Sequence, residues 1–270
     1  MAADSYSREC GKLLQPVIAI AREAGKRILE IYDGNFSVKH KPDESPVTEA
    51  DIAAHHVIID GLKALTPELP VLSEESAGDI PFGERARWHC YWLVDPLDGT
   101  REFIKRNGEF TVNIALIEGH APVLGVIHAP ASGICYFASR RCGAYRQEKG
   151  EGPQQIHSRA TRETPVIAVS RSRCNPRHER LLEKIGAHEI IAVGSSLKSC
   201  LVAEGSADLY ARLGPTSEWD TAAAQCIVEQ AGGHITDTRM QPLSYNTKPS
   251  LLNPDFFVFG ASWRDWSRYL

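Results

Sequence analysis

The chain has 270 residues, of which 43% are hydrophobic and 24% charged, with a net charge of −4 and a pI of about 6.2. This length fits one large domain or two small domains that pack closely, and no stretch approaches the ~20 apolar residues that a membrane span requires. The acidic balance argues against a basic face for nucleic acid, so bound cations would have to attract any anionic ligand.

The seven cysteines are odd in number and include no CxxC pair. The N-terminal stretch from Met1 to Cys10 is polar, so we expect no signal peptide. Without a secretory signal, the cysteines are expected to be reduced thiols in a cytoplasmic protein, and a zinc site is not expected.

Two amphipathic helices are predicted in the first quarter of the chain. Apolar residues with helical spacing run over 13–32, and Asp33-Gly34 would end this helix. The polar segment 35–47 predicts a surface loop or a loose hairpin, and Thr48 then opens a second helix. Asp51 stands three positions after Thr48, as in a capping box, and capping alone would explain it. The residues expected to be buried on this helix are Ile52, Ile59 and Leu62.

The stretch over 91–100 carries the most informative pattern. Four apolar or aromatic residues, Tyr91 to Val94, predict a buried strand that runs into a tight turn. The turn would hold Asp95 and Asp98, followed by Gly99, which permits a left-handed backbone. Two carboxylates in fixed geometry suit hard cations, which prefer oxygen ligands. An Asp-Gly turn without any metal is the alternative interpretation of this stretch alone.

The rest of the chain divides into two halves, 1–150 and 151–270, which we expect to form one compact unit with a polar boundary at 149–163. In the first half we expect a short strand at 71–72, a loop over 77–89, and half-buried antiparallel strands at 110–117, 122–128, 133–138 and 143–147. In the second half, strands alternate with helices, which predicts mixed or parallel pairing. The strands are expected at 165–170, 189–193, 208–212, 234–237 and 256–260, and the helices at 176–186, 196–204 and 217–231.

Further acidic residues stand where strands end or helices begin. Glu74-Glu75 follows the strand at 71–72, and Asp220 follows Trp219, which is expected to pack beneath the site. Each acid has an ordinary explanation, since paired glutamates are usually solvated and an acid suits the first turn of a helix. Gathered in one cleft, however, six acids would repel one another unless cations filled it, and oxygen ligands favour Mg²⁺ over zinc. The six are Asp51, Glu74, Glu75, Asp95, Asp98 and Asp220.

Three strings resemble signatures of the inositol monophosphatase superfamily, and the similarity extends over nearly the whole chain. The strings are Ser-Glu-Glu-Ser at 73–76, Trp-Leu-Val-Asp-Pro-Leu-Asp-Gly-Thr at 92–100 and Trp-Asp-Thr-Ala-Ala at 219–223. The resemblance implies a mixed α/β (α+β) fold, a five-layered αβαβα sandwich of the inositol monophosphatase and fructose-1,6-bisphosphatase type. It also implies a magnesium-dependent, lithium-sensitive phosphomonoesterase with its active site between the two halves.

The resemblance further implies a set of metal ligands. One Mg²⁺ would be held by Glu74, Asp95 and the backbone carbonyl of Leu97. A second would be held by Asp95, Asp98 and Asp220. A third, weaker ion near Glu74 and Asp51 is common in such enzymes. Two Mg²⁺ ions can clamp the attacking and leaving oxygens of a phosphate ester, whose uncatalysed hydrolysis is among the slowest known reactions.

Water is the nucleophile that we expect. By the resemblance, Thr100 and Asp51 would orient it and accept its proton with help from Glu74, and the N–H groups of Gly99 and Thr100 would face a phosphate oxygen. Thr100 could also cap a helix, and the two roles are compatible. A phosphoaspartate mechanism is not expected, because such enzymes carry Asp-x-Asp near an N-terminal strand, whereas this chain has Asp-x-x-Asp beginning at Asp95.

Two further stretches, 101–113 and 194–198, resemble the bacterial 3′(2′),5′-bisphosphate nucleotidases of this superfamily, the CysQ type. Inositol phosphatases carry small apolar residues where this chain has Ser196, Leu197 and Lys198. The implied reaction removes the 3′-phosphate of 3′-phosphoadenosine 5′-phosphate to give AMP, and 3′-phosphoadenosine 5′-phosphosulfate is a second candidate substrate. An inositol monophosphatase and a non-catalytic nucleotide-binding regulator are the alternatives.

Hydroxyls at the start of a helix and a nearby ammonium suit an anionic substrate, and Ser195, Ser196 and Lys198 supply them. Arg212 could contribute from the strand before Asp220. Helix capping would also explain the two serines, and a surface ion pair would explain Arg212. The full set expected on the substrate side is Glu74, Leu97, Asp98, Gly99, Thr100, Ser195, Ser196, Lys198, Arg212 and Asp220. The sequence leaves open whether the protein is a monomer or a dimer, and any association with the cytoplasmic face of an inner membrane would be peripheral.

Overall fold

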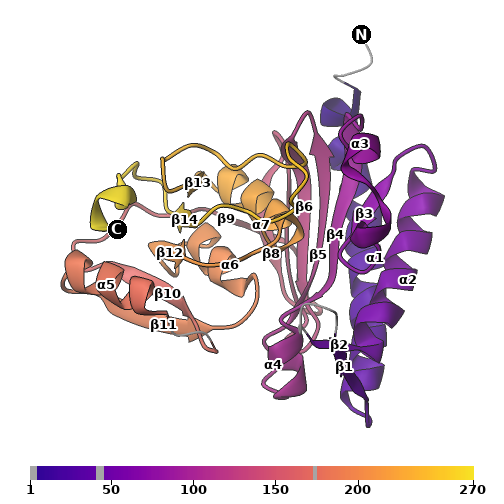
Figure 1. Ribbon diagram of the computed structural model, residues 1–270, viewed down its shortest axis with the longest axis horizontal. Helices are drawn as coiled ribbons and strands as arrows, with labels where there is room; N and C mark the ends of the chain where they lie inside the picture. The colour runs from indigo at the N-terminus through magenta and orange to yellow at the C-terminus, as the bar shows by residue number, and fades with distance from the viewer. Residues whose placement is uncertain (1–4, 41–45, 173–174) are drawn as a thin grey trace.

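The computed structural model describes residues 5–40, 46–172 and 175–270 and has five layers, as the resemblance implied (Figure 1). Two helices cover one face of a seven-stranded sheet, and two more lie between that sheet and a five-stranded sheet. A further helix covers the outer face of the second sheet. Within these described ranges, no helix is long and apolar enough to cross a lipid bilayer.

The outer helices α1 (Ser5–Tyr32) and α2 (Glu49–Leu65) confirm the two predicted helices. The predicted stripe on α2 was partly wrong, because Ile52 is 42% exposed and Ile59 is only half-buried. Four-residue steps from Ala50 keep one face of the helix against the sheet, whereas Ile52 stands about 200° around the helix from Ala50. The buried residues of α2 are Ala50, Asp51, Ala54, Ile58 and Leu62.

The polar segment after α1 forms a hairpin. Strand β1 (Val38–His40) pairs antiparallel with β2 (Pro46–Thr48), and residues 41–45 lie outside the described residues. Thr48 then caps α2, since its hydroxyl accepts from the Ala50 N–H and its own N–H donates to Asp51. The hairpin therefore leads the chain to the start of α2, where Asp51 stands.

The seven-stranded sheet has the order β3-β4-β5-β6-β7-β8-β9 and is antiparallel except where β3 runs parallel to β4. Its strands are β3 (Val71–Ser73), β4 (Cys90–Asp98), β5 (Thr111–Glu118), β6 (Ala121–Ala129), β7 (Ile134–Ser139), β8 (Gly143–Gln147) and β9 (Gln154–Ile156). The antiparallel strands were expected to be half-buried, but every residue of β5 is buried because helices cover both faces of the sheet. Strand β9 comes after residue 150 and still pairs with β8, and the division of the chain at residue 150 stays a prediction.

Strand β4 differs from the prediction at the end that carries the acids. Asp95 and Asp98 were expected in a turn after the strand, but β4 continues through both and still pairs with β5 there. A bulge between Asp95 and Asp98 shifts the register, and bulges re-aim neighbouring side chains. The turn itself begins at Gly99, whose φ is +90°.

The loop predicted over 77–89 contains two short helices, η1 (Ala77–Asp79) and α3 (Phe82–Arg85). Arg85 is buried, and its guanidinium donates to the side chain of Asn246 and to the Lys248 carbonyl. Helices this short complete barely one turn, so hydrophobic periodicity cannot reveal them. The loop therefore fastens the first sheet to the segment that follows β13.

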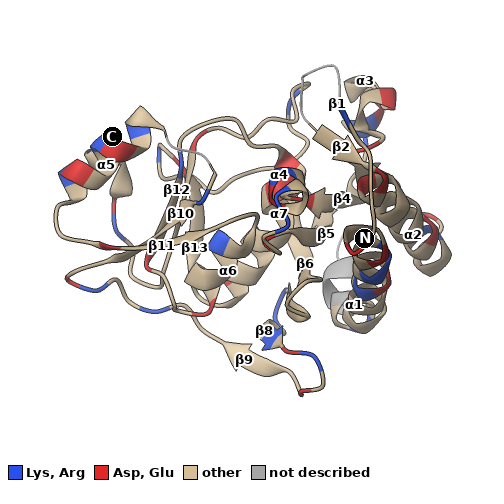
Figure 2. Cartoon of the chain, turned by 90° about the horizontal axis from the view of Figure 1, so that it is seen from below, with Lys and Arg blue, Asp and Glu red and all other residues tan. Residues whose placement is uncertain are grey.

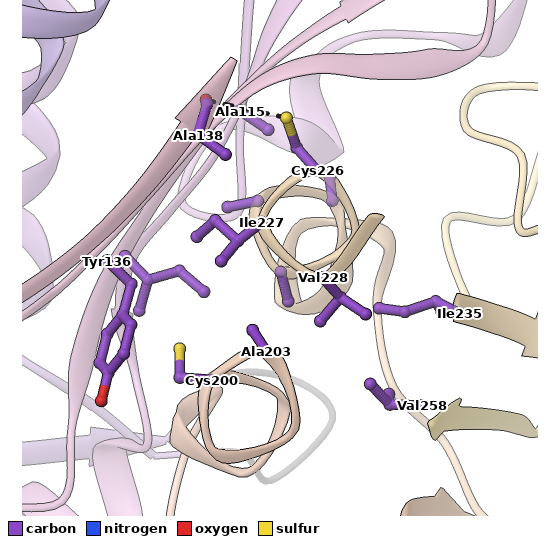
Figure 3. Close-up of a cluster of buried hydrophobic side chains, with 14 of the residues drawn as sticks. Ala115, Tyr136, Ala138, Cys200, Ala203, Cys226, Ile227, Val228, Ile235 and Val258 are labelled. Carbon is purple, nitrogen blue, oxygen red and sulfur yellow. Dashed lines mark hydrogen bonds between the residues drawn. The ribbon is translucent and has the colours of Figure 1, made fainter. Parts of the chain in front are cut away.

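Helices α6 (Leu197–Ala203) and α7 (Glu218–Gln230) form the middle layer, where helices were predicted. Figure 3 shows Ile227 of α7 pointing toward β7, and Val228 pointing toward Ile235 and Val258 of the second sheet. The backbone of α7 also lies very close to β6, because a Cβ placed on Gly125 would be 2.4 Å from the Ala223 carbonyl oxygen. Contact between two backbones therefore sets the position of α7.

The five-stranded sheet has the order β11-β10-β12-β14-β13, in which β10 is parallel to both neighbours and β14 antiparallel to both of its own. Its strands are β10 (Val166–Ser170), β11 (Glu189–Val193), β12 (Leu209–Arg212), β13 (His234–Asp237) and β14 (Phe256–Phe259). Helix α5 (Pro176–Ile185) covers the outer face through Leu181, which packs in one cluster with Ile167 and Phe257. The mixed pairing and the alternation of strands and helices agree with the prediction.

The charged residues of both halves are mixed in sign. Figure 2 shows Lys and Arg positions interspersed with Asp and Glu positions along α1, α2 and α5. The expectation that the chain does not bind nucleic acid stays a prediction.

His128 of β6 provides a test of how burial affects stability. The residue is 6% exposed, and burial lowers the pKa of His128 to about 4 from the usual 6.5. Between these values the unfolded chain binds a proton that the folded chain does not, so stability should fall as the pH drops, by about 1.4 kcal/mol per pH unit. Urea unfolding at pH 7 and pH 5 should therefore show a smaller pH-dependent loss for His128→Gln than for the parent. His56→Gln, at an exposed position of α2, controls for the substitution itself and should keep the parent's stability at pH 7 within about 0.5 kcal/mol. An unchanged pH-dependent loss in His128→Gln would contradict the prediction.

Candidate metal centre and active site

A cavity of about 660 Å³ opens where the end of β4, the start of α4 (Thr100–Ile104), the turn before α6 and the start of α7 meet. Every candidate catalytic, metal-binding or substrate-binding residue except Asp51 lines it. The lining candidates are Glu74, Asp95, Leu97, Asp98, Gly99, Thr100, Ser195, Ser196, Lys198, Arg212 and Asp220. Glu75, which was expected in the same cleft, is not among the lining residues, because the chain turns directly after Ser73 and only Glu74 faces the cavity.

Three carboxylates from distant parts of the sequence converge in this cavity. Asp95 and Asp98 come from the bulged end of β4, and Asp220 comes from the first turn of α7. One oxygen from each lies within 4.8 Å of the others. Residues of the two halves therefore share one acidic centre, which is the arrangement that the sequence predicted.

The acidic centre is electrostatically unfavourable as it stands. Burial, reinforced by the charges of Glu74, Asp98 and Asp220, raises the pKa of Asp95 well above its usual range. Burial, followed by the charges of Asp98 and Glu74, raises the pKa of Asp220 to about 8. Across the described ranges, no Lys or Arg forms a salt bridge with Asp95, Asp98 or Asp220. An uncompensated set of oxygen donors fits a hard divalent cation such as Mg²⁺.

Backbone hydrogen bonds fix two of these carboxylates. Oδ1 of Asp95 accepts from the Leu97 N–H at 3.0 Å, across the bulge. Oδ2 of Asp220 accepts from the Ser217 N–H at 3.0 Å, as the third residue of a capping box. Asp220 lies in the first turn of α7, where an acid suits the helix as the ordinary explanation had it, and this position does not exclude it from the acidic centre.

Thr100 and Asp51 form a pair at the edge of the cavity. The Thr100 hydroxyl lies 3.3 Å from Oδ1 of Asp51 and 3.3 Å from the Leu97 carbonyl oxygen. The other oxygen of Asp51 accepts from both the N–H and the hydroxyl of Thr48, each at 2.7 Å. Capping thus holds Asp51 in place for Thr100. The N-cap position of α4 belongs to Gly99, so the alternative of Thr100 as the cap was wrong.

The turn before α6 forms the opposite wall of the cavity. The hydroxyls of Ser195 and Ser196 both donate to Oδ2 of Asp98 at 2.7 Å. Neither hydroxyl caps α6, because Ser196 at the N-cap makes no side-chain capping bond. The helix-capping explanation of these serines is therefore wrong, and they contact the acidic centre directly.

The two candidate cations already have partners within the protein. Lys198 is 5% exposed, and its ammonium donates to the Ser195 carbonyl and lies 5.2 Å from the centre of the Tyr210 ring. Arg212 donates to the Thr216 hydroxyl and the Pro215 carbonyl, and no acid among the residues that the structure describes pairs with it, so the suggested surface ion pair is not found there. Both side chains line the cavity.

Two residues of β5 that the sequence did not single out support this wall. Oγ1 of Thr111 lies 2.6 Å from the Ser195 hydroxyl, and the side-chain amide of Asn113 donates to the Ser196 hydroxyl at 2.9 Å. Residues two apart on a strand share a face, so the pattern Thr-x-Asn next to the acidic strand was the available signal.

Comparison with known proteins agrees with this geometry. A model of the inositol monophosphatase family matches residues 11–259. The chain belongs to the inositol monophosphatase family. Family members depend on magnesium, in keeping with the carboxylate centre.

Relatives within this family cover almost the whole chain. The 3′(2′),5′-bisphosphate nucleotidase CysQ of Escherichia coli K12 is 51% identical over 249 residues, which is 91% of this chain and 99% of the relative. CysQ of Aggregatibacter actinomycetemcomitans is 45% identical and covers 91% and 92% of the two chains. The crystal structure of CysQ from Bacteroides thetaiotaomicron superimposes with a TM-score of 0.79 at 41% identity, over 92% of this chain and 97% of that one.

Proposed function

We propose that this member of the inositol monophosphatase family is a magnesium-dependent 3′(2′),5′-bisphosphate nucleotidase. The reaction is hydrolysis of the 3′-phosphate of 3′-phosphoadenosine 5′-phosphate to AMP and phosphate, with the 5′-phosphosulfate analogue as a further substrate. The observation that carries this proposal is 51% identity to a bisphosphate nucleotidase over 99% of that enzyme's length. The convergence of Asp95, Asp98 and Asp220 in the cavity supports it independently.

The proposed ligands divide the donors between two ions. Glu74, Asp95 and the Leu97 carbonyl would hold the first Mg²⁺, and Asp95, Asp98 and Asp220 the second. A third ion near Glu74 and Asp51, and inhibition by Li⁺, are part of the same proposal. When bound, Mg²⁺ would supply charge neutralisation for the phosphate and a lowered pKa for water.

The residues around the centre would manage the proton and the phosphate. Because Oδ1 of Asp51 can accept the Thr100 proton, the Thr100 oxygen is left to accept a hydrogen bond from the attacking water. The water proton would pass to Thr100 as the Thr100 proton passes to Asp51, with Glu74 assisting from the edge of the cavity. The N–H groups of Gly99 and Thr100 would bind a phosphate oxygen. No covalent phosphoenzyme forms in this scheme.

The proposed nucleotide side of the cavity contains Ser195, Ser196, Lys198 and Arg212. Their present partners are protein groups, so a nucleotide would compete with the Ser195 and Pro215 carbonyls for the two cations. The location of the protein in the cytoplasm, free or at the inner face of the inner membrane, stays a prediction.

Phosphate release measured with two substrates tests the proposal. With Mg²⁺, the protein should hydrolyse 3′-phosphoadenosine 5′-phosphate in preference to inositol 1-phosphate, and Li⁺ should inhibit the reaction. Preference for inositol 1-phosphate would make it an inositol monophosphatase. Tight nucleotide binding without turnover of either ester would make it a regulator.

Lys198→Ala should separate nucleotide recognition from chemistry. Because the ammonium is a buried point charge beside the cavity, its loss should raise KM for the bisphosphate nucleotide by about 10-fold, the effect of one charged hydrogen bond. KM for p-nitrophenyl phosphate, which has no second phosphate, should change by less than about 3-fold on the same reasoning. Equal effects on both esters would remove Lys198 from nucleotide recognition.

A further inference from the structure

The turn formed by Gly194, Ser195 and Ser196 holds an unfavourable backbone conformation. Ser195 has a φ of +54°, in the left-handed region that residues with a Cβ avoid. Such conformations persist only where the surroundings over-determine them, and they concentrate at functional sites. The turn must therefore be held by specific contacts, in addition to the two hydrogen bonds that its serines donate to Asp98.

One acid from the first half meets this turn directly. Glu109, between α4 and β5, accepts the Gly194 N–H on Oε2 at 2.8 Å. The approach is close, since a Cβ on Gly194 would lie 2.9 Å from the Glu109 carbonyl oxygen and 3.0 Å from the Glu109 Cβ. Only glycine fits this contact, so Glu109 and the turn are matched in shape as well as in hydrogen bonding.

An arginine from the second half completes the contact. Arg171, the residue after β10, pairs with Glu109 through two nitrogens, with Nε 2.8 Å from Oε2 and Nη2 2.7 Å from Oε1. The same Nη2 donates to the Ala192 carbonyl at the end of β11, at 2.7 Å. Bidentate pairs of this kind fix orientation as well as distance. Glu109 and Arg171 together therefore bind the chain on both sides of Gly194.

We propose that Glu109 and Arg171 are positioning residues for the acidic centre. They hold the turn 194–196 in its left-handed conformation, the turn holds Ser195 and Ser196 on Oδ2 of Asp98, and the serines fix the direction of that carboxylate. Neither Glu109 nor Arg171 lines the cavity, so both act through the turn. The test below has two readouts. Hydrolysis of the nucleotide rests on the proposed function, whereas stabilisation of the protein by Mg²⁺ can be measured without any substrate.

A second ion pair, within the second half of the chain, provides a matched control. Arg177 and Asp255 lie 2.7 Å apart with side chains 50% and 22% exposed, against 50% and 18% for Arg171 and Glu109. Neither Arg177 nor Asp255 lines the cavity. A purely structural effect of losing one such ion pair should be the same at both places.

The experiment compares Arg171→Ala, Glu109→Ala, Glu109→Gln and the double alanine variant with Arg177→Ala. One readout is the Mg²⁺ concentration that gives half-maximal thermal stabilisation without substrate, and the other is kcat/KM for 3′-phosphoadenosine 5′-phosphate. We expect Arg171→Ala and Glu109→Ala to raise the Mg²⁺ midpoint at least 5-fold and to lower kcat/KM at least 10-fold. Arg177→Ala should change neither readout by more than 2-fold, whatever its melting temperature.

The conservative variant and the double variant sharpen the result. Glu109→Gln keeps an acceptor for the Gly194 N–H and should recover part of both readouts. The double alanine variant should have the same Mg²⁺ midpoint and kcat/KM as Glu109→Ala, because the Glu109–Arg171 pair acts as one unit that either change removes. If the Mg²⁺ midpoint of Arg171→Ala equals that of Arg177→Ala, the positioning role is overturned. If the parent protein does not hydrolyse the nucleotide at all, the proposed function fails while the Mg²⁺ midpoint still decides the inference.

Discussion

Replacing Asp95 by Asn should lower kcat by roughly 10³-fold while making the metal-free protein more stable. The loss of activity follows because Asp95 is the acid shared by both proposed ions, and metal charge supplies several kcal/mol of transition-state stabilisation. The gain in stability follows because Asp95 is buried among other acids and its pKa is raised. Folding must therefore either protonate this carboxyl or bury its charge, and Asn avoids both costs.

Thermal unfolding in EDTA and in Mg²⁺, together with phosphate release, measures both effects. Asn retains the oxygen that accepts from the Leu97 N–H, so the bulge should survive the change. Glu118→Gln is the matched control. Glu118 is a buried acid at the end of β5 that lies away from the cavity, and it does not line the cavity. That variant should keep full activity. Near-full activity of Asp95→Asn would refute the metal centre. If Asp95→Asn melted at a lower temperature than the parent in EDTA, repulsion among the buried carboxylates would not be destabilising the metal-free protein.

Replacing Gly125 by Ala should cost about 3 kcal/mol of stability and about 10²-fold in kcat/KM. The added methyl would stand 2.4 Å from the Ala223 carbonyl oxygen and 3.0 Å from the Ala223 Cα, so the backbone of α7 must move away from β6. Overpacking a rigid contact costs a few kcal/mol. Since α7 carries Asp220, its shift also displaces a proposed ligand, and misplacement by about 1 Å costs on the order of 10²-fold.

Urea unfolding and steady-state kinetics of Gly125→Ala test this prediction. Gly78→Ala is the control, because no atom lies within 4 Å of a Cβ at Gly78 and its φ lies outside the left-handed region. Its stability should stay within about 0.5 kcal/mol of the parent. If Gly125→Ala had the parent's unfolding midpoint, the backbone of α7 would not be in direct contact with β6 at Gly125.

The acidic centre could be foreseen because a short motif carries most of it. Asp95 and Asp98 follow a strand that is recognisable from its apolar run, and an acid pair at a strand end suggests a cation on chemical grounds alone. Asp220 stands 122 residues after Asp98, and only the family resemblance connected the two in advance. Their convergence is now observed, whereas the role of each residue as a ligand or catalyst stays a prediction.

The surroundings of the centre could not be foreseen, because they are long-range contacts between polar groups. Ser195 and Ser196 looked like helix caps from the sequence, but their partner is Asp98, nearly a hundred residues earlier. The same holds for Glu109 and Gly194, which are 85 residues apart. The partner of a hydroxyl or a carboxylate depends on which segments the fold brings together, and local pattern does not contain that information.

The elements of the fold divide in a similar way. Helix α1 has a clear apolar period and ends at Tyr32 as predicted, although it begins earlier than expected. Helix α7 is buried on most sides, and its predicted range of 217–231 is within one residue of the observed Glu218–Gln230. The end of β4 was not predicted correctly. Pairing with β5 continues the strand through Asp95 and Asp98, with a bulge between them. The register of the neighbouring strand decides where such a bulge lies.

The seven-stranded sheet and Asp220 come from separate, consecutive stretches of the chain. The last strand of that sheet ends at Ile156, and α7 begins only at Glu218. During synthesis from the N-terminus, the whole first sheet is therefore translated, with its aspartate pair in place, before the third carboxylate exists. If Asp220 is a ligand as proposed, we expect a nascent polypeptide halted ahead of α7 to be inactive, because it lacks the third carboxylate of the centre.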